Sequence, residues 1–114
     1  MKTSPNDIRI ALERKIVRKL IRMMRHAGWM PYKVDDGGDK LISVTTEAEI
    51  LDAVFAVDEA RIKFYDGKCI HNVLVVLGNE YDVICDWSYN ETDNFNSVME
   101  AHGAYTNKLE EAKA

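Results

Sequence analysis

The feature that most constrains the fold is a long amphipathic segment at the start of the chain. Ser4 suits the N-cap of a helix, Pro5 suits its first turn, and Gly28 is a natural stop. At 100° per residue, the side chains of this helix divide into an apolar half and a basic half on opposite sides. Arg9 and Glu13 are the two exceptions on the apolar half. The apolar half holds Ile10, Leu12, Ile16, Val17, Leu20, Ile21, Met23, Met24 and Ala27. The rest of the chain must therefore supply a surface that buries this half.

Five extended runs and two further helices are predicted downstream. The extended runs are 30–34, 40–45, 60–65, 68–77 and 81–88, and the helices are 46–57 and a last one that starts near Thr92 or Asp93. Thr46 and Glu49 form a capping box at the start of the second helix. With 114 residues, the chain is expected to form one α+β domain, 1–114, in the order α-β-β-α-β-β-β-α. Helices are expected to pack on an antiparallel sheet.

Turn residues set the expected strand registers. Asp66-Gly67 is typical of a two-residue hairpin turn, which would place Ile62 opposite His71 and Phe64 opposite Cys69. A three-residue loop or a bulge near 78–80 would place Cys85 opposite Val73. This alignment keeps Cys69 and Cys85 too far apart for a disulfide, so both thiols are expected to be free.

The fourth extended run is apolar on both of its faces. Val73, Val75 and Leu77 are expected to face the core, whereas Ile70, Leu74 and Val76 lie on the other face, with Ile84 from the next run. Arg61, Lys63, Asp82 and Asp86 would surround this second set. An apolar centre with a charged rim is typical of a partner-binding site. A helix that covers the second face would explain the pattern equally well.

The basic half of the first helix is the second candidate surface, and it comprises Arg14, Lys15, Arg18, Lys19, Arg22 and Arg25. It could be a solvated face, a protein-binding face or a nucleic-acid-binding face. A membrane is disfavoured as a partner because the apolar half contains neither Trp nor Phe. The net charge of −4 argues against a dedicated nucleic-acid binder, and so does the acidic second part of the chain. Residues 1–50 carry a net charge of +3, whereas residues 51–114 carry −7.

The sequence offers little catalytic chemistry. It has no phosphate-binding glycine loop, no His-Glu-x-x-His and no Cys-x-x-Cys, so neither a metal nor a cofactor is expected. Asp82 and Asp86 are expected about 13–14 Å apart, too far to share a metal or to act as an acid–base pair. His71 is expected to be a packed or hydrogen-bonded histidine, and the chain is expected not to be an enzyme. No apolar run approaches the length of a membrane helix or a signal peptide, so a cytoplasmic location is expected.

The segment from Leu77 to Ser88 resembles a stretch in small accessory proteins of phages and prophages. They share the pattern Gly-Asn-acid-aromatic-Asp-Val-Ile-x-Asp-aromatic near the end of a three-stranded meander. The resemblance implies an accessory protein of a mobile element that binds a host or phage protein, including a defence factor, and it implies no catalytic residues. The leading hypothesis is thus a non-enzymatic protein-binding protein, with inhibition of a host factor as one form of that binding and a homodimer as another form of partner. The alternative is a small nucleic-acid-binding regulator that uses the basic helix.

Overall fold

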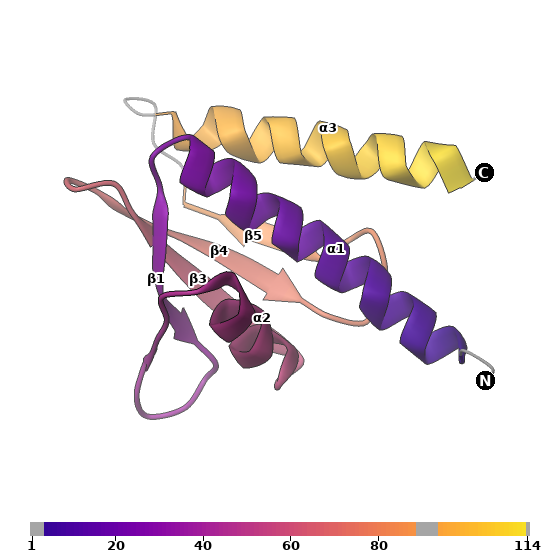
Figure 1. Cartoon of the computed structure of the whole chain (residues 1–114), viewed down its shortest axis with the longest axis horizontal. Helices are drawn as coiled ribbons and strands as arrows, with labels where there is room; N and C mark the ends of the chain where they lie inside the picture. Colours follow the sequence, from indigo (N-terminus) through magenta and orange to yellow (C-terminus); the bar gives the residue numbers. More distant parts are fainter. Residues whose placement is uncertain (1–3, 89–93, 114) are drawn as a thin grey trace.

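The fold is an antiparallel sheet with helices packed on one face (Figure 1). The computed structural model describes residues 4–88 and 94–113. Its elements are α1 (Pro5–His26), β1 (Met30–Asp35), β2 (Ile42–Ser43), α2 (Glu47–Phe55), β3 (Glu59–Tyr65), β4 (Ile70–Val76), β5 (Ile84–Trp87) and α3 (Phe95–Lys113). The predicted α+β class and element order are confirmed in these residues. The predicted start of the last helix, Thr92 or Asp93, lies outside them.

Both predicted helix starts within the described residues have the expected caps. The Ser4 hydroxyl accepts a hydrogen bond from the backbone N–H of Asp7, and Gly28 follows α1 with a φ of 95°. Thr46 and Glu49 form the predicted capping box at the start of α2. Because local side chains satisfy the free N–H groups at these ends, the sequence alone located the ends correctly.

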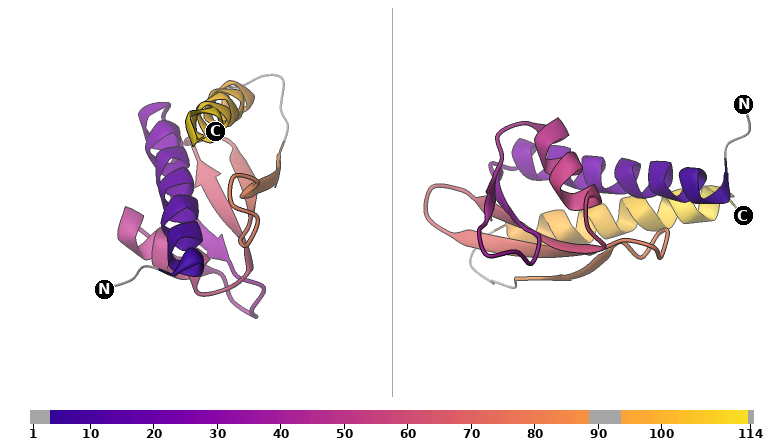
Figure 2. Two further views of the ribbon diagram at one scale, coloured as in Figure 1. Left: turned by 90° about the vertical axis from the view of Figure 1, so that its right-hand side faces the viewer. Right: turned by 90° about the horizontal axis from the view of Figure 1, so that it is seen from below.

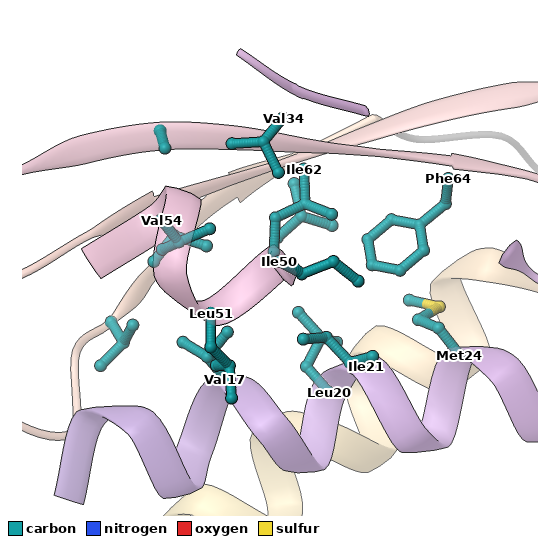
Figure 3. Packing of buried hydrophobic residues seen from close by; sticks show 14 of the residues in the cluster. Val17, Leu20, Ile21, Met24, Val34, Ile50, Leu51, Val54, Ile62 and Phe64 are labelled. Carbon is teal, nitrogen blue, oxygen red and sulfur yellow. The ribbon is translucent and has the colours of Figure 1, made fainter. Parts of the chain in front are cut away.

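The sheet has the strand order β2-β1-β3-β4-β5, and every neighbouring pair is antiparallel. Figure 2 shows the helices on one side of it, and α1 and α3 lie side by side. The core lies between α1, α2 and the sheet, where Leu20, Ile50 and Ile62 are fully buried (Figure 3). A hydrogen bond of 2.8 Å between His102 Nε2 and the Ile16 carbonyl oxygen joins α3 to α1.

The predicted register between β3 and β4 is wrong by two residues. Ile62 lies opposite Val73 and Phe64 opposite His71, so residues 66–69 form a four-residue connection. The carboxylate of Asp66 explains the longer turn, because it accepts the backbone N–H groups of Lys68 at 2.9 Å and Cys69 at 2.8 Å. A shift of two residues leaves every side chain on its predicted face, because strand side chains alternate with a period of two.

The predicted register between β4 and β5 is also wrong, and here the faces change. Trp87, not Cys85, lies opposite Val73, and Ile84 lies opposite Val75. The register shifts between Leu74 and Val75, where Cys85 of β5 is the extra residue, so the irregularity lies inside the strand pair and not at 78–80, where the sequence predicted it. Cys85 is exposed and Cys69 is half-buried, and both are free cysteines.

Candidate functional site

The sheet has a face turned away from the helices, which we call the outer face. Side chains of β3 and β4 alternate between the core and this face: Ala60, Ile62 and Phe64 are buried, whereas Arg61 and Tyr65 are exposed. In the described residues, no helix covers the outer face, so the alternative that a third layer buries it is not supported.

Three large apolar side chains form a row across the outer face. Tyr65 lies directly opposite Met30 on β1 and directly opposite Ile70 on β4. Met30 is 51 % exposed, Tyr65 is 44 % exposed and Ile70 is 54 % exposed. The ring of Tyr32 lies 6.1 Å from the ring of Tyr65 and extends the row. We call these four residues the apolar row. They make up a contiguous apolar surface on the end of the sheet next to the β3–β4 turn.

The other predicted members of the partner-binding patch are separated from Ile70. Leu74 and Val76 lie half-buried on the outer face, but a hydrogen bond of 2.9 Å between Lys63 Nζ and Asn72 Oδ1 lies between Ile70 and Leu74. Leu74 is itself flanked by Arg61 on β3 and Asp86 on β5. The outer face is therefore an apolar row beside a region of mixed charge, and not one apolar centre inside a charged rim.

Ile84 was predicted on the outer face, but the register shift in β5 places it on the core side. Its partner Val75 faces the core, and Ile84 lines a cavity of about 240 Å³ beside α3, together with Trp87 and His102. Asp82 also lines this cavity, while Asp86 lies on the outer face and accepts the backbone N–H of Trp87 at 2.9 Å. The structure thus separates the two aspartates that the sequence placed on one face.

The basic half of α1 is largely engaged by α2 and by the residues just before it. Glu47 forms ion pairs with both Arg18 and Arg22. Its Oε1 lies 3.2 Å from Nε of Arg18, and its Oε2 lies 2.9 Å from Nε of Arg22. The hydrogen bond from Arg22 lowers the pKa of Glu47, and the same bond raises the pKa of Arg22. Arg25 donates to the carbonyl oxygen of Thr45 at 2.9 Å. Arg18, Arg22 and Arg25 each contact another segment of the chain, so this half of the helix is not simply a solvated face.

Of the other basic residues of α1, Arg14 and Lys19 contact aromatic rings, and Lys15 is exposed. The Arg14 guanidinium lies 5.2 Å from the ring centroid of Phe55 and 4.0 Å from a carboxylate oxygen of Asp52. Lys19 lies 5.2 Å from the ring of Tyr105 on α3, and Lys15 is exposed. An anion that binds this helix would have to compete with most of these intramolecular partners.

Glu13 is the residue whose role the sequence did not reveal. It is fully buried, and its carboxylate is paired with Arg9 one turn earlier. The same carboxylate accepts the backbone N–H groups of Gly78 at 2.8 Å and Glu80 at 3.0 Å. Glu13 thereby fixes the loop after β4 against α1. The signal was present, since Arg9 and Glu13 were the two exceptions on the apolar half of the helix.

Two of the histidines, His71 and His102, are buried and packed against or bonded to neighbouring segments. His71 is buried, stacked 4.4 Å from Phe95 and edge-on to Trp29 at 5.0 Å. Burial lowers the pKa of His102, whose Nε2 must carry the proton because the Ile16 carbonyl oxygen can only accept. Within residues 4–88 and 94–113, no three His, Cys, Asp or Glu side chains are grouped so that they could hold a metal ion. None of the helices described there has the length and apolar character needed to cross a membrane.

Comparison of the chain with models of protein families, with curated proteins and with solved structures gave no match. The geometry described above is therefore the basis for assigning a function.

Proposed function

We propose that this chain is a non-enzymatic protein-binding protein that takes its partner on the outer face of the sheet. The observation that carries the proposal is the apolar row, in which Met30, Tyr65 and Ile70 lie directly opposite one another and are each about half exposed. Fully burying an exposed side chain of this size is worth about 1.5–3 kcal/mol, so covering the half-exposed Met30, Tyr65 and Ile70 would contribute roughly half of that each. Tyrosine and methionine are also enriched in protein interfaces.

The composition of the surrounding face supports a protein partner. Arg61, Lys63, Asp35 and Asp86 lie on the outer face beside the row, so both signs of charge are present. Mixed charge beside an apolar row fits another protein better than it fits the uniformly negative backbone of a nucleic acid. The alternative, a nucleic-acid-binding regulator that uses α1, has less support because Glu47 already receives Arg18 and Arg22.

The resemblance of 77–88 to phage and prophage accessory proteins extends the proposal to a biological setting. In that setting the partner is a host or phage protein, and the chain inhibits a host or defence factor. This part of the proposal depends on the resemblance alone. A homodimer formed through the same face is the other form of partner.

The test compares two exposed isoleucines. Ile70→Asp places a charge in the apolar row, and Ile8→Asp makes the same change at a 57 % exposed position on α1. Both variants are expected to fold, as judged by circular dichroism. Sedimentation velocity then measures self-association, and affinity capture from host lysate measures foreign partners. The proposal predicts that Ile70→Asp loses the partner, whereas Ile8→Asp retains it. Equal behaviour of the two variants, or a wild-type chain with no partner in either assay, would show that the outer face is not a binding surface.

A further inference from the structure

A second surface lies on the opposite side of the molecule, between α1 and α3. These helices run side by side (Figures 1 and 2), and a groove of about 440 Å³ lies between them. Met23 of α1 and Val98 of α3 are half-buried within it. The groove is open at the surface and apolar along its centre, so it can accept an elongated apolar group.

The two walls of this groove differ in charge. The α1 wall presents Lys19, Arg22 and His26, which recur at i, i+3 and i+7 and so form one row about 10 Å long. The α3 wall presents Ser97 and Ala101, which are small and neutral. Nothing among the described residues that line the groove is a carboxylate, although the chain as a whole has 19 acidic and 15 basic residues.

Lys19 and His26 have no carboxylate partner among the described residues, whereas Arg22 is already paired with Glu47 and would share its donors with an external anion. Arg22 donates to Glu47 through Nε and Nη2, but its side chain remains 64 % exposed. Lys19 is exposed, with its ammonium group over the ring of Tyr105. His26 is exposed in the last turn of α1.

Hydrogen bonds of Asn94 hold one end of the groove in place. Its Oδ1 accepts the indole N–H of buried Trp29 at 2.7 Å, and its Nδ2 donates to the carbonyl oxygen of Ala27 at 3.3 Å. At the other side, His102 joins α3 to Ile16 of α1. The spacing of the helices is thus set before a ligand binds, which reduces the ordering cost of binding.

We propose that the α1–α3 groove binds an amphipathic helix of a partner protein, with an apolar stripe on the groove floor and acidic side chains toward α1. Ser97 and Ala101 allow the backbone of a third helix to approach α3 closely, because they project few atoms into the groove. Lys19 and His26, with Arg22 sharing its donors between Glu47 and the ligand, select carboxylates on one flank of that helix, since no carboxylate lines the groove among the described residues. This site is separate from the outer face and does not depend on the function proposed for that face.

The experiment uses a fluorescently labelled peptide of about five helical turns, roughly 18 residues. The peptide carries Leu at i, i+3, i+4 and i+7 and Glu along one flank, and a second peptide carries Lys at each Glu position. Binding to the full chain is measured by fluorescence anisotropy. Ala101→Trp fills the groove from an exposed helix position. Lys19→Glu reverses a charge on the α1 wall, and Lys15→Glu makes the same change on α1 outside the groove.

The proposal predicts that the Glu peptide binds and that the Lys peptide binds at least tenfold more weakly. Ala101→Trp should abolish binding, Lys19→Glu should weaken it at least fivefold, and Lys15→Glu should change it less than twofold. Equal binding of the two peptides, full binding to Ala101→Trp or no binding of the Glu peptide would each overturn the proposal. Loss of peptide binding in Ile70→Asp with full binding to Ala101→Trp would also overturn it, and would place the helix on the outer face instead. Groove-dependent binding of phosphatidylserine vesicles without peptide binding would identify the occupant as a membrane and would likewise refute it.

Discussion

Replacing Glu13 with alanine should destabilise the protein more than any other single change to a charged residue on α1. The carboxylate is fully buried and accepts two backbone N–H groups, those of Gly78 and Glu80. Hydrogen bonds to a charged acceptor contribute about 1.5–3 kcal/mol each, which gives about 3–6 kcal/mol for the pair. Gly78 and Glu80 are exposed residues, so water can reach part of the vacated site. We therefore expect Glu13→Ala to lower the free energy of unfolding by about 2–4 kcal/mol.

Urea unfolding followed by tryptophan fluorescence measures this change, because Trp29 is fully buried in the folded chain. With a urea dependence of about 1–3 kcal/mol per molar, the midpoint should fall by about 1 M or more. Glu13→Gln should cost less, about 1–2 kcal/mol, because the amide oxygen can still accept an N–H group while the charge is lost. Glu110→Ala makes the same substitution at an exposed position of α3 and should change the stability by less than about 0.5 kcal/mol. If Glu13→Ala costs less than about 1 kcal/mol, the reasoning about this carboxylate is refuted.

Two further predictions concern pH and the two faces of the sheet. Burial lowers the pKa of His102, so as pH falls below about 6.5 the unfolded chain takes up a proton that the folded chain excludes. Stability should therefore decrease from neutral pH downwards until the folded-state pKa is reached, and His102→Gln should flatten this part of a chemical-denaturation series while keeping an N–H donor for Ile16. A variant with the wild-type pH profile would assign the dependence to other groups. Leu74→Asp should remain folded because Leu74 lies on the outer face, whereas Val75→Asp should unfold the chain by placing a charge in the core. Circular dichroism compares the two, and unfolding by both would mean that the outer face is covered.

The sequence predicted the helices and strands well because their signals are local. Ser4, Thr46 and Gly28 act on their own helix ends, so no tertiary information is needed to recognise them. The faces of the strands were also predictable where the observed register differs from the predicted register by an even number of residues. The β3–β4 turn differs from the expected one by two residues in register, and Ile62, Phe64, Val73 and Val75 nevertheless lie on the core side.

The candidate site was less predictable, because it depends on contacts between distant segments. The extra residue Cys85 of β5, opposite the step from Leu74 to Val75, moves Ile84 from the outer face to the helix side, whereas the sequence predicted the irregularity at 78–80. The apolar row is exposed because the helices all pack on the other face of the sheet, and this arrangement depends on contacts between distant segments. The sequence named Ile70 but did not connect it with Met30 and Tyr65, because the β1–β3 pairing joins residues far apart in the chain.

The edges of the sheet indicate how a partner can be recognised. At one edge, β2 has only two residues, and at the other β5 has four residues and an irregular register. The backbone N–H of Ser88 donates to the Asn72 carbonyl oxygen at 3.0 Å, so the N–H of Trp87, one residue earlier, points away from β4, and the Asp86 carboxylate accepts it at 2.9 Å. Short strands, a bulge and an occupied N–H all oppose the addition of another strand. Recognition through the described part of the sheet must therefore use side chains on its outer face, which is where Met30, Tyr65 and Ile70 are exposed.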